Sequence, residues 1–500
     1  MPARVLLVYP PSRSQTHDSC PSSLTMLGAV LRQAGHQVHL LDANAVSRRR
    51  DADQIVRFAD ELKPDVIGIT LVTPLVREAY RLASGLRATG AKLLAGGPHA
   101  TLLPEEPLAH GFDATVIGEG EPTVDEAVQA LVGAVPKEGV AGWVYRDETG
   151  RPRRTAARPP VADLDALPTP ARDLVDPADY GGDDNRRLHS NLFSSRGCPG
   201  KCSYCSGSLF GRRFRFRSAA SLLDEICALH ALHRTPHFHF MDDAMSANRE
   251  RMLEICAGLE TRGLGVTWSM MTRIDFVDEE ILTAARRAGC NEIDYGVESG
   301  HPETLRRIRK AHTVQMVRRI IPMTAALGIK PTVFFILGFP WDTPASIDET
   351  LRLMQELSPH VTCFHPALAS ILVPFPGTEI YESYKEQYGF GEWWLQSDRN
   401  YDAPGWGHAH FETQLFARGA VLDADFFRYS PEVRRKIYEV FEFMWRHNLS
   451  QSPRTQRLAA RASFETSRRL HALSPALERE VFRMAALLRR TVAHLRPHTA

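Results

Sequence analysis

Short runs of β-branched residues and leucines alternate with longer segments of helical period along the first 145 residues. In the longer segments apolar residues recur at i, i+3 and i+4, as they do in helices that pack on a buried parallel sheet. The pattern predicts a doubly wound, Rossmann-like α/β unit. The expected strands are 5–9, 37–41, 66–71, 92–95 and 114–117, and the expected helices are 24–34, 52–62, 75–89 and 122–131.

Residues 147–187 break this pattern with many Pro, Asp and Arg residues, which predicts a linker with one hairpin turn at 147–150. Strand and helix periods then alternate again, beginning with a strand near Leu192. Five further strands are expected at 237–241, 266–270, 292–296, 332–337 and 365–372, and the helices at 221–232, 249–261, 279–288, 304–309, 314–327 and 347–356.

From residue 376 the chain changes to aromatic-rich loops and then to helical periods that run to residue 500. We interpret 393–410 as a lid, because large rings with polar edges exclude water and contact substrates. Arginines are frequent in 451–500; a solvated helix face is the favoured interpretation, and contact with an anionic partner is the alternative. The expected units are 1–146, 147–187, 188–375 and 376–500.

Composition narrows the function classes. Sixty basic and fifty-nine acidic residues leave a net charge of +1, so the chain has no overall field that would attract nucleic acid. No apolar run reaches the roughly 20 residues of a membrane span, and the first residues lack a signal-peptide core. We therefore expect a cytoplasmic protein with no nucleic-acid partner and no membrane span.

Three of the eight cysteines lie close together as C-x-x-x-C-x-x-C, at Cys198, Cys202 and Cys205. Three thiolates on one loop can bind three irons of a cubane cluster and leave the fourth iron open. A structural zinc site, the alternative, would need a fourth Cys or His at short spacing, and the residues that follow offer none. Of the other cysteines, Cys227 and Cys256 lie at core positions of predicted helices, and Cys20 has no evident role.

The cysteine motif, with Tyr204 before its third cysteine, resembles that of radical S-adenosylmethionine (SAM) enzymes. This resemblance implies an open, partial (β/α)6 barrel, a [4Fe-4S] cluster, SAM bound to the open iron, and Tyr204 near the adenine. It also implies that Arg273 contacts the SAM carboxylate, that Glu298 contacts the ribose or the amino group, and that the backbone of 241–243 contacts the ammonium. A surface pair of Arg273 and Asp275 is the alternative. The expected SAM contacts are Tyr204, Met241, Asp242, Asp243, Arg273, Glu298, Ser299 and Gly338.

The first unit lacks a G-x-G-x-x-G after its first strand, where Tyr9-Pro10-Pro11-Ser12 stands instead. Thr70 after the third strand and Gly96-Gly97 after the fourth resemble the cobalamin-binding domain of B12 enzymes, in which glycines let the backbone approach the nucleotide tail. The expected contacts are Tyr9, Pro10, Thr70, Leu71, Val72, Gly96, Gly97, Pro98, His99, Gly118, Glu119 and Gly120. A flavodoxin-like domain with another ligand is the alternative.

The family's D-x-H-x-x-G loop, which supplies a histidine to cobalt, is replaced here by residues 16–20. We therefore expect base-off methylcobalamin without a histidine ligand, its lower face against residues 72–75.

The order of these units resembles the B12-dependent radical SAM family, class B methyltransferases. The resemblance implies a radical methyl transfer from methylcobalamin to an unactivated carbon, or less often to phosphorus, of a small natural-product intermediate in antibiotic or secondary-metabolite biosynthesis. A second SAM would remethylate the cobalamin, and a flavodoxin or ferredoxin would supply electrons. A cyclase or rearrangement enzyme without methyl transfer and a non-catalytic cobalamin sensor are the alternatives.

Overall fold

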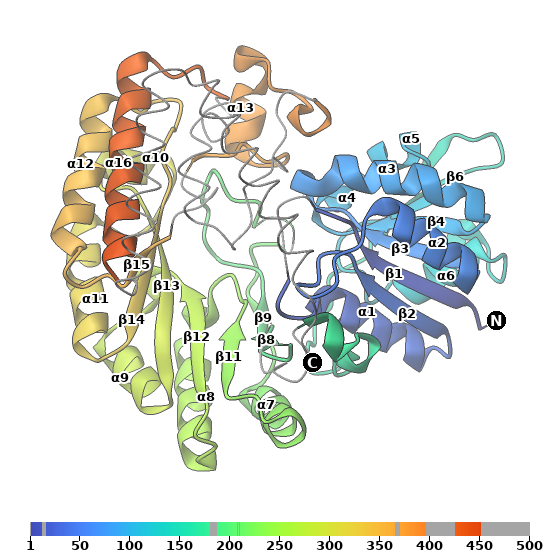
Figure 1. Ribbon diagram of the computed structural model, residues 1–500, viewed down its shortest axis with the longest axis horizontal. Coiled ribbons are helices and arrows are strands. Elements are labelled where there is room, and N and C mark those ends of the chain that lie inside the picture. The colour runs from blue at the N-terminus through green and yellow to red at the C-terminus, as the bar shows by residue number, and fades with distance from the viewer. Residues whose placement is uncertain are drawn as a thin grey trace, which may run out of the picture.

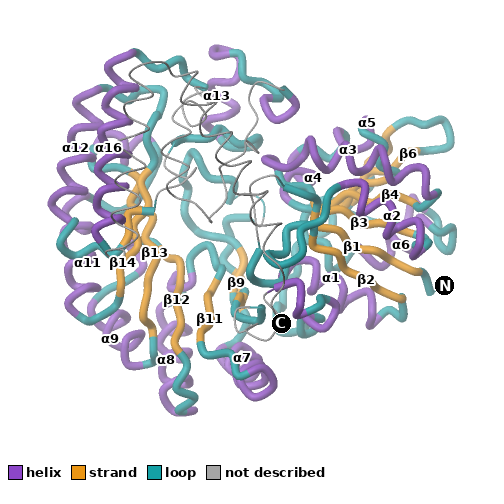
Figure 2. Tube along the Cα trace, viewed as in Figure 1, coloured by secondary structure: helices purple, strands orange, loops and turns teal. Residues whose placement is uncertain are grey.

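The computed structural model describes residues 2–12, 17–180, 188–207, 209, 211–365, 371–396 and 426–451. Within these ranges the chain forms two α/β units that lie side by side, the first coloured blue and the second green to orange in Figure 1. In both units helices cover the strands, as Figure 2 shows. The expected fold class, two α/β units followed by a helical region, is confirmed.

The first unit is built on a seven-stranded sheet of order β2-β1-β3-β4-β5-β6-β7. The first five strands in this order pair in parallel, while β6 and β7 pair antiparallel, so an antiparallel hairpin extends the predicted sheet. The strands are β1 (Arg4–Tyr9), β2 (Gln37–Asp42), β3 (Val66–Thr70), β4 (Lys92–Gly96), β5 (Ala114–Val116), β6 (Trp143–Arg146) and β7 (Pro152–Arg154). β7 arises from the stretch that we expected to be a linker with a hairpin turn at 147–150, and that turn joins β6 to β7.

Alternation along the strands decides which helices cover each face of this sheet. Leu6 and Val8 of β1 pack with α2 and α3 in one hydrophobic cluster, whereas Val5 and Leu7 pack with α1 and α6 in another. This is the two-sided burial of a doubly wound sheet. The helices are α1 (Ser22–Gln33), α2 (Ala52–Leu62), α3 (Val76–Leu86), α4 (Pro98–Leu102), α5 (Glu106–Ala109) and α6 (Val124–Leu131).

The second unit is a six-stranded, all-parallel sheet of order β15-β14-β13-β12-β11-β8, the expected partial barrel. Its strands are β8 (Asn191–Leu192), β11 (His237–Phe240), β12 (Thr267–Thr272), β13 (Cys290–Glu298), β14 (Lys330–Phe335) and β15 (Cys363–Phe364). Its helices are α7 (Ala219–His233), α8 (Arg249–Arg262), α9 (Glu279–Arg287), α10 (Pro302–Arg307), α11 (Val314–Ala326) and α12 (Pro344–Leu357). A separate two-stranded ribbon, β9 (Ser195–Arg196) and β10 (Arg215–Phe216), flanks the cysteine loop.

The sixth strand was expected at 365–372, and residues 366–370 of that range lie outside the described residues. The structure has the short β15 at Cys363–Phe364, and beyond it only the isolated bridge between Leu337 and Ile371 in the part of the chain that it describes. Helix α16 (Pro431–Ser450) covers the outer edge of β15: Asn448 accepts from the N–H of Phe364 at 2.9 Å and donates to its C=O at 2.6 Å. A side chain of α16 thus satisfies the groups that this edge strand would otherwise leave unpaired.

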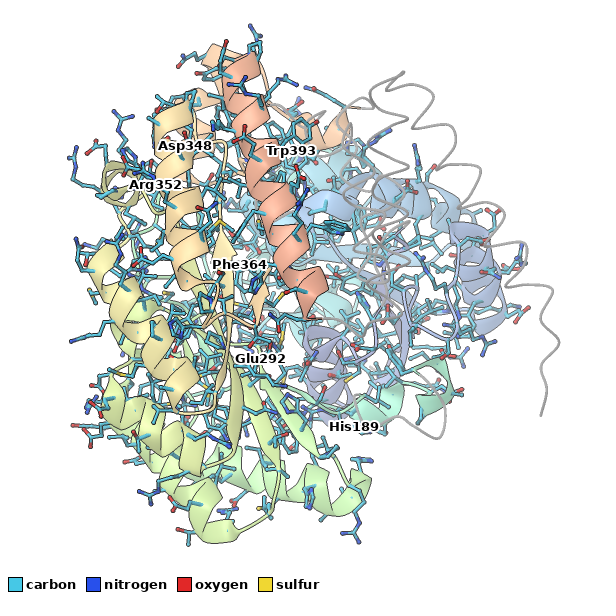
Figure 3. All side chains as sticks on the ribbon, turned by 60° about the vertical axis from the view of Figure 1, so that its left-hand side comes forward. His189, Glu292, Asp348, Arg352, Phe364 and Trp393 are labelled. Carbon is cyan, nitrogen blue, oxygen red and sulfur yellow. The ribbon has the colours of Figure 1, made fainter. Side chains whose placement is uncertain are left out.

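Helix α16 lies beside α12 on the outside of the barrel, as Figure 3 shows. Lys436 of α16 lies 2.9 Å from the Asp348 carboxylate of α12. Helix α13 (Glu379–Tyr388) and the turn Trp393–Leu395 precede the undescribed stretch that includes most of the expected lid. No helix in the described part of the chain is both long and apolar enough to span a membrane. The arginine-rich stretch from residue 452 lies outside the described residues.

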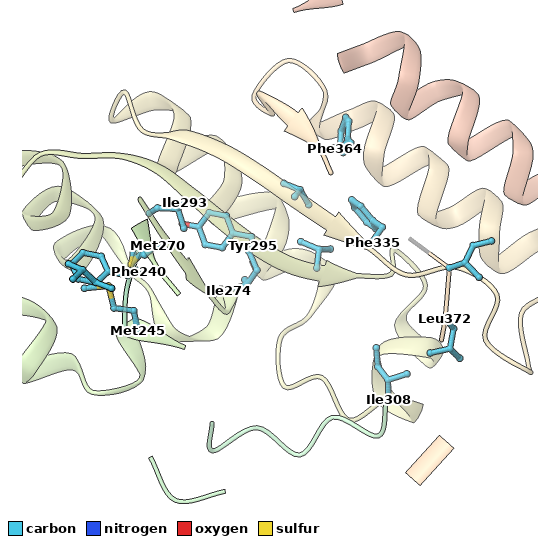
Figure 4. Close-up of a cluster of buried hydrophobic side chains, with 14 of the residues drawn as sticks. Phe240, Met245, Met270, Ile274, Ile293, Tyr295, Ile308, Phe335, Phe364 and Leu372 are labelled. Atoms are coloured by element: carbon cyan, nitrogen blue, oxygen red, sulfur yellow. The ribbon is translucent and has the colours of Figure 1, made fainter. Parts of the chain in front are cut away.

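The strands of the barrel alternate between an apolar outer face and a polar inner face. Phe240, Met270, Ile293 and Tyr295 belong to the buried cluster in Figure 4. Positions between them carry polar groups, such as Glu292, whose carboxylate accepts a hydrogen bond from Thr332 at 2.9 Å. Ionisable groups are thereby held inside the barrel, away from bulk water.

Asp294 on this inner face should make stability depend on pH. Burial and the charge of Glu292 raise its pKa from 3.8 to about 7, so its ionisation costs stability progressively as pH rises from about 4 to about 7. Asp294→Asn should therefore be more stable than the wild type at pH 8, by up to about 4 kcal/mol, and similar to it near pH 4. Urea unfolding at both pH values measures this difference, with the exposed Asp60→Asn as control. A wild type more stable than the variant at pH 8 would contradict the assignment.

Candidate functional site

A cavity of about 880 Å³ lies between the two units. It is bounded on one side by the carboxyl ends of β1, β3, β4 and β5, and on the other by residues that follow β8 and β11, such as Phe193 and Met241. Ligands bind at such strand ends in α/β sheets. The cavity is therefore placed where a cofactor on the first sheet faces the barrel.

Most of the residues expected to bind cobalamin line this cavity. They are Tyr9, Thr70, Val72, Gly96, Gly97, Pro98, Gly118, Glu119 and Gly120, joined from the barrel side by Met241 and Asp243. Pro10, Leu71, His99 and Asp242 are not among its lining residues. The cavity also has walls that the sequence did not indicate: Leu164, residues 167–170 and Arg172 of the expected linker, and Phe193, Arg196 and Arg217 of the barrel. Phe193 directly follows strand β8, and ligands bind at the carboxyl ends of such strands, so its position in the sequence could have identified it.

Thr70 and the glycine pair meet at the ends of β3 and β4, where Thr70 pairs with Gly96. A Cβ on Gly96 would meet no atom within 4 Å, so the open space beside it belongs to the cavity. Gly97 has φ +95°, and a Cβ there would lie 2.9 Å from the Leu71 carbonyl oxygen. The second glycine is thus required by the protein's own backbone, whereas the first leaves room for a ligand.

Gly96→Ala should weaken cobalamin binding without destabilising the fold. The added methyl group meets no protein atom but enters the cavity, and such overpacking costs about 1–3 kcal/mol. Titration with hydroxocobalamin, followed by absorbance, measures the loss, and the melting temperature should stay unchanged. Gly139→Ala, where a Cβ also meets nothing within 4 Å but which does not line the cavity, is the control. Unchanged affinity in Gly96→Ala would place the cofactor elsewhere.

No histidine is among the described residues that line the cavity. His17, in the loop that replaces the cobalt-ligating motif, has its Nδ1 2.7 Å from the Asp42 carboxylate. His99 is buried, with Nδ1 3.1 Å from the Thr73 hydroxyl and Nε2 2.9 Å from Glu106. Glu106 also accepts from the Trp394 indole at 3.0 Å, which anchors the described start of the expected lid. His99 therefore has a structural role in this arrangement, and its expected cofactor contact remains a prediction.

The three cysteines of the motif share a loop in which each sulfur has a donor nearby. The N–H of Gly200 points at Cys198 Sγ at 3.4 Å, and the N–H of Gly207 at Cys205 Sγ at 3.3 Å. The guanidinium of Arg273 lies 3.4 Å from Cys202 Sγ. Donors of this kind stabilise the thiolates that bind iron. The loop fits a cluster with one open iron.

The protonation of the cysteines and their arrangement both affect how the loop can bind a metal. Burial raises the pKa of Cys205 to about 11, so its deprotonation depends on metal binding. Among the described residues no three His, Cys, Asp or Glu side chains are arranged to hold a single metal ion. Cysteines that bind separate irons of a cubane need not converge on one point, so this finding is compatible with a cluster.

Arg273 is not part of a surface pair. It is 6% exposed, donates to both oxygens of Asp275 at 3.0 and 2.9 Å, and lies over the Phe276 ring. Burial disfavours its charge, but the hydrogen bonds and charge of Asp275 outweigh this and raise its pKa. A permanent cation is thereby held beside the cysteine loop, and a contact to a ligand carboxylate remains a prediction.

Tyr204, Glu298 and Lys310 form a buried cluster that sequence reasoning found only in part. Glu298 Oε1 accepts from Tyr204 at 2.8 Å and from Lys310 at 2.7 Å. The register of β13 with β14 shifts between Gly296 and Glu298, and Glu298 has φ +71°, a strained conformation typical of functional sites. A Cβ on Gly296 would lie 2.5 Å from Glu298 Oε1. The bulge and the glycine together aim Glu298 at Tyr204; no local pattern pointed to Lys310.

Three other residues expected to contact SAM are held by the protein itself. Buried Asp242 accepts from the N–H of Ser194 at 2.7 Å and from the Ser195 hydroxyl at 2.7 Å, so it orders the start of the cysteine loop. Ser299 Oγ lies 3.2 Å from Thr350 Oγ1. The Gly338 N–H donates to Asp342 at 2.9 Å, and its C=O accepts from Tyr429 at 2.6 Å. Neighbouring Asp243 lines the cavity, and burial and the charge of Asp242 raise its pKa.

Comparison with known proteins agrees with this arrangement. Residues 14–128 match the family model of the B12 binding domain, and residues 192–354 match that of the Radical SAM superfamily. The chain is 29% identical to an uncharacterized methyltransferase of Pyrococcus horikoshii, over 76% of this chain and 82% of that protein. It is 30% identical to the anaerobic magnesium-protoporphyrin IX monomethyl ester cyclase of a Synechocystis strain, over 67% of this chain and 69% of the relative.

A similar fold occurs in the radical S-adenosylmethionine methyltransferase TsrM of Kitasatospora setae, solved with cobalamin and a [4Fe-4S] cluster bound. The TM-score is 0.65 at 20% identity, with 78% of this chain and 76% of that chain covered. The two matched models, the relatives and the paired α/β units lead to one conclusion: the chain belongs to the B12-dependent radical SAM family of enzymes, as the cysteine motif and the glycine pair predicted.

Proposed function

We propose that this chain is a methyltransferase that transfers a methyl group from methylcobalamin to an unactivated carbon of a small natural-product intermediate. The cavity shared by both units is the observation that carries this proposal. It lets a methyl donor held on the first sheet lie within reach of a radical generated at the barrel, and such proximity is needed because neither cofactor alone attacks an inert carbon. Phosphorus is the alternative acceptor atom.

The described geometry supports the proposed cofactor sites. Cys198, Cys202 and Cys205 would bind the [4Fe-4S] cluster, and Thr70 and Gly96 would border the cobalamin. When bound, the cluster with SAM supplies a 5′-deoxyadenosyl radical that takes a hydrogen atom from the substrate, and methylcobalamin supplies the methyl group. We infer base-off cobalamin without a histidine ligand, since the described histidines nearest the expected loops are bonded elsewhere.

The chain's own residues would orient the bound SAM. Arg273 offers its charge to the carboxylate, and Glu298 offers its second oxygen to the amino group or the ribose. Lys310 and Tyr204 fix the first oxygen of Glu298, so the carboxylate is held in one orientation before the ligand arrives. Preorganisation of this kind lowers the cost of binding.

The net reaction balances with two SAM molecules and two electrons. One SAM leaves as methionine and 5′-deoxyadenosine, the other leaves as S-adenosylhomocysteine, and one substrate C–H becomes C–CH₃. The electrons require an external low-potential donor of the flavodoxin or ferredoxin type, so we place the enzyme with such donors in the cytoplasm.

Product mass tests the proposal. Anaerobically reconstituted full-length protein would be reduced and supplied with SAM that carries a deuterated methyl group. Candidate substrates would be chosen from the pathways that the neighbouring genes encode. We expect a product that has gained one labelled methyl group, together with 5′-deoxyadenosine and S-adenosylhomocysteine. The Cys202→Ala variant is the control and should give neither methylated product nor 5′-deoxyadenosine. A dehydrogenated or rearranged product of unlabelled skeleton would refute methyl transfer.

A cyclase is the second candidate, because the chain shares 30% identity with a cyclase relative. Both candidates would use the same cofactor sites, and the same labelling experiment separates them. A cyclisation leaves the carbon count of the substrate unchanged, whereas methyl transfer raises it by one.

A further inference from the structure

The base of the cysteine loop carries two arginines that face each other. The loop, residues 197–214, connects strand β9 to strand β10. These two strands pair as an antiparallel ribbon, in which Arg196 lies opposite Arg215. A Cβ on Gly197, which has φ +80°, would lie 2.6 Å from the Arg213 carbonyl oxygen, so the two ends of the loop run close together. Like charges directly opposite each other destabilise an antiparallel pair. This ribbon therefore needs negative charge from outside itself.

The negative charge comes from the other unit. Glu119, on the loop that follows β5, accepts from Arg215 through both carboxylate oxygens, one of them at 3.0 Å, and also lies 3.4 Å from Arg196. Glu121 accepts from Arg196 at 2.6 Å. The Glu119 and Arg215 side chains are 3% and 7% exposed. Buried bidentate pairs of this kind are strong and geometrically specific, so one acidic loop holds both ends of the cysteine loop.

The same acidic loop is joined to the glycine pair at the cavity. Thr101 Oγ1 donates to the Gly97 carbonyl at 3.0 Å and accepts from the Gly118 N–H at 3.0 Å. Gly97, Thr101, Gly118 and Glu119 all line the cavity. A chain of hydrogen bonds and ion pairs therefore leads from the proposed cobalamin site to the base of the cysteine loop.

We propose that Glu119 is a positioning residue that couples cobalamin binding to the β9–β10 ribbon at the base of the cysteine loop, and thereby to cluster binding. A ligand that fills the cavity contacts the loops that carry Gly97 and Glu119, and so stabilises the arrangement in which the Glu119 carboxylate lies beside Arg196 and Arg215. The coupling is reciprocal, because binding free energies are linked: an assembled cluster strengthens cobalamin binding by the same factor. The inference rests on the proposed cofactor sites and does not require methyl transfer.

The test is a comparison of two dissociation constants. Hydroxocobalamin is titrated into cluster-free and into anaerobically reconstituted full-length protein. We expect tighter binding to the reconstituted wild type, within the roughly 5- to 150-fold range of allosteric couplings. In Glu119→Gln the two constants should become equal. A merely structural role would weaken both constants together and leave their ratio unchanged.

Matched variants keep the result interpretable. Glu126→Gln removes a carboxylate of the same unit that pairs with Arg158 and is 46% exposed, and it should keep the wild-type ratio. Glu119→Asp retains the charge, and its ratio of the two dissociation constants should lie between one and the wild-type value. Glu121→Gln removes only the Arg196 contact and should lower the ratio; it takes the place of Glu119→Gln should that variant fail to fold.

Hydrogen exchange gives a second readout that needs no turnover. In the wild type, hydroxocobalamin should slow amide exchange in peptides covering 195–216, and in Glu121→Gln it should slow exchange less. A wild-type ratio of one, or a ratio preserved in both Glu119→Gln and Glu121→Gln, would overturn the proposal. Since neither measurement uses a substrate, a coupled protein that methylates nothing would refute the proposed function and leave this inference standing.

Discussion

A Cys202→Ala variant is expected to form no 5′-deoxyadenosine while still binding cobalamin. Cys202 is the middle residue of the three-cysteine motif, and its sulfur lies 3.4 Å from the Arg273 guanidinium. Removing one of three thiolates deprives one iron of its ligand, and the cluster that cleaves SAM is then not retained. The cobalamin site, which uses other residues across the cavity, should persist.

Iron content, the absorbance of the reconstituted cluster and 5′-deoxyadenosine after reduction measure this effect. Cys227→Ala is the matched control, because Cys227 is a half-buried cysteine of α7 whose sulfur lies 3.1 Å from Arg262, away from the motif. It should behave as the wild type. SAM cleavage by Cys202→Ala at the wild-type rate would disprove the assignment of the cluster ligands.

Glu298→Gln is expected to lower the free energy of unfolding by about 3–5 kcal/mol. Glu298 and Lys310 are 7% and 5% exposed and lie 2.7 Å apart. An amide can still accept from Tyr204, but it cannot neutralise Lys310, and an unpaired buried charge accounts for the loss. SAM binding should weaken as well, since the carboxylate charge is the feature proposed to meet the ligand.

Urea unfolding and a double-mutant cycle test this expectation. Glu298→Gln/Lys310→Met should be less destabilised than the sum of its single variants, because the second change removes the charge that the first leaves unpaired. Glu303→Gln is the control: it breaks the ion pair between Glu303 and Arg306, whose side chains are 39% and 75% exposed, respectively. It should lower the free energy of unfolding by less than about 1 kcal/mol. An unfolding curve of Glu298→Gln identical to the wild type would show that the ion pair contributes nothing.

Local signals in the sequence predicted most of the helices and strands of both units. Helix α2 begins and ends where its pattern predicts. A capping box of Asp51 and Gln54 fixes its start, and Lys63, with φ 51°, ends it in the left-handed conformation. The sixth barrel strand was expected at 365–372 and β15 lies at Cys363–Phe364, because its position is set by pairing with β14 and not by a local pattern. The β6–β7 hairpin joined the first sheet for a similar reason: its turn is local, but its pairing with β5 is not.

In the candidate site, too, some features are visible along the chain and others depend on contacts between distant elements. The cysteine spacing and the Gly96-Gly97 pair are visible along the chain, because loops that bind cofactors keep their ligands and their glycines within a few residues. Lys310 and the Glu119, Arg196 and Arg215 contacts are not visible in this way, since each joins residues from different elements.

The sequence by itself thus determined the fold class and the family, and it indicated the proposed cluster ligands, because all of these depend on period and spacing. Only the tertiary structure decided which charges are paired, why Glu298 adopts a strained backbone, and that residues 167–170 and Arg172 border the cavity. The physical reason is that burial and ion pairing depend on which surfaces meet when the two units pack. Those contacts leave no periodic pattern in the chain.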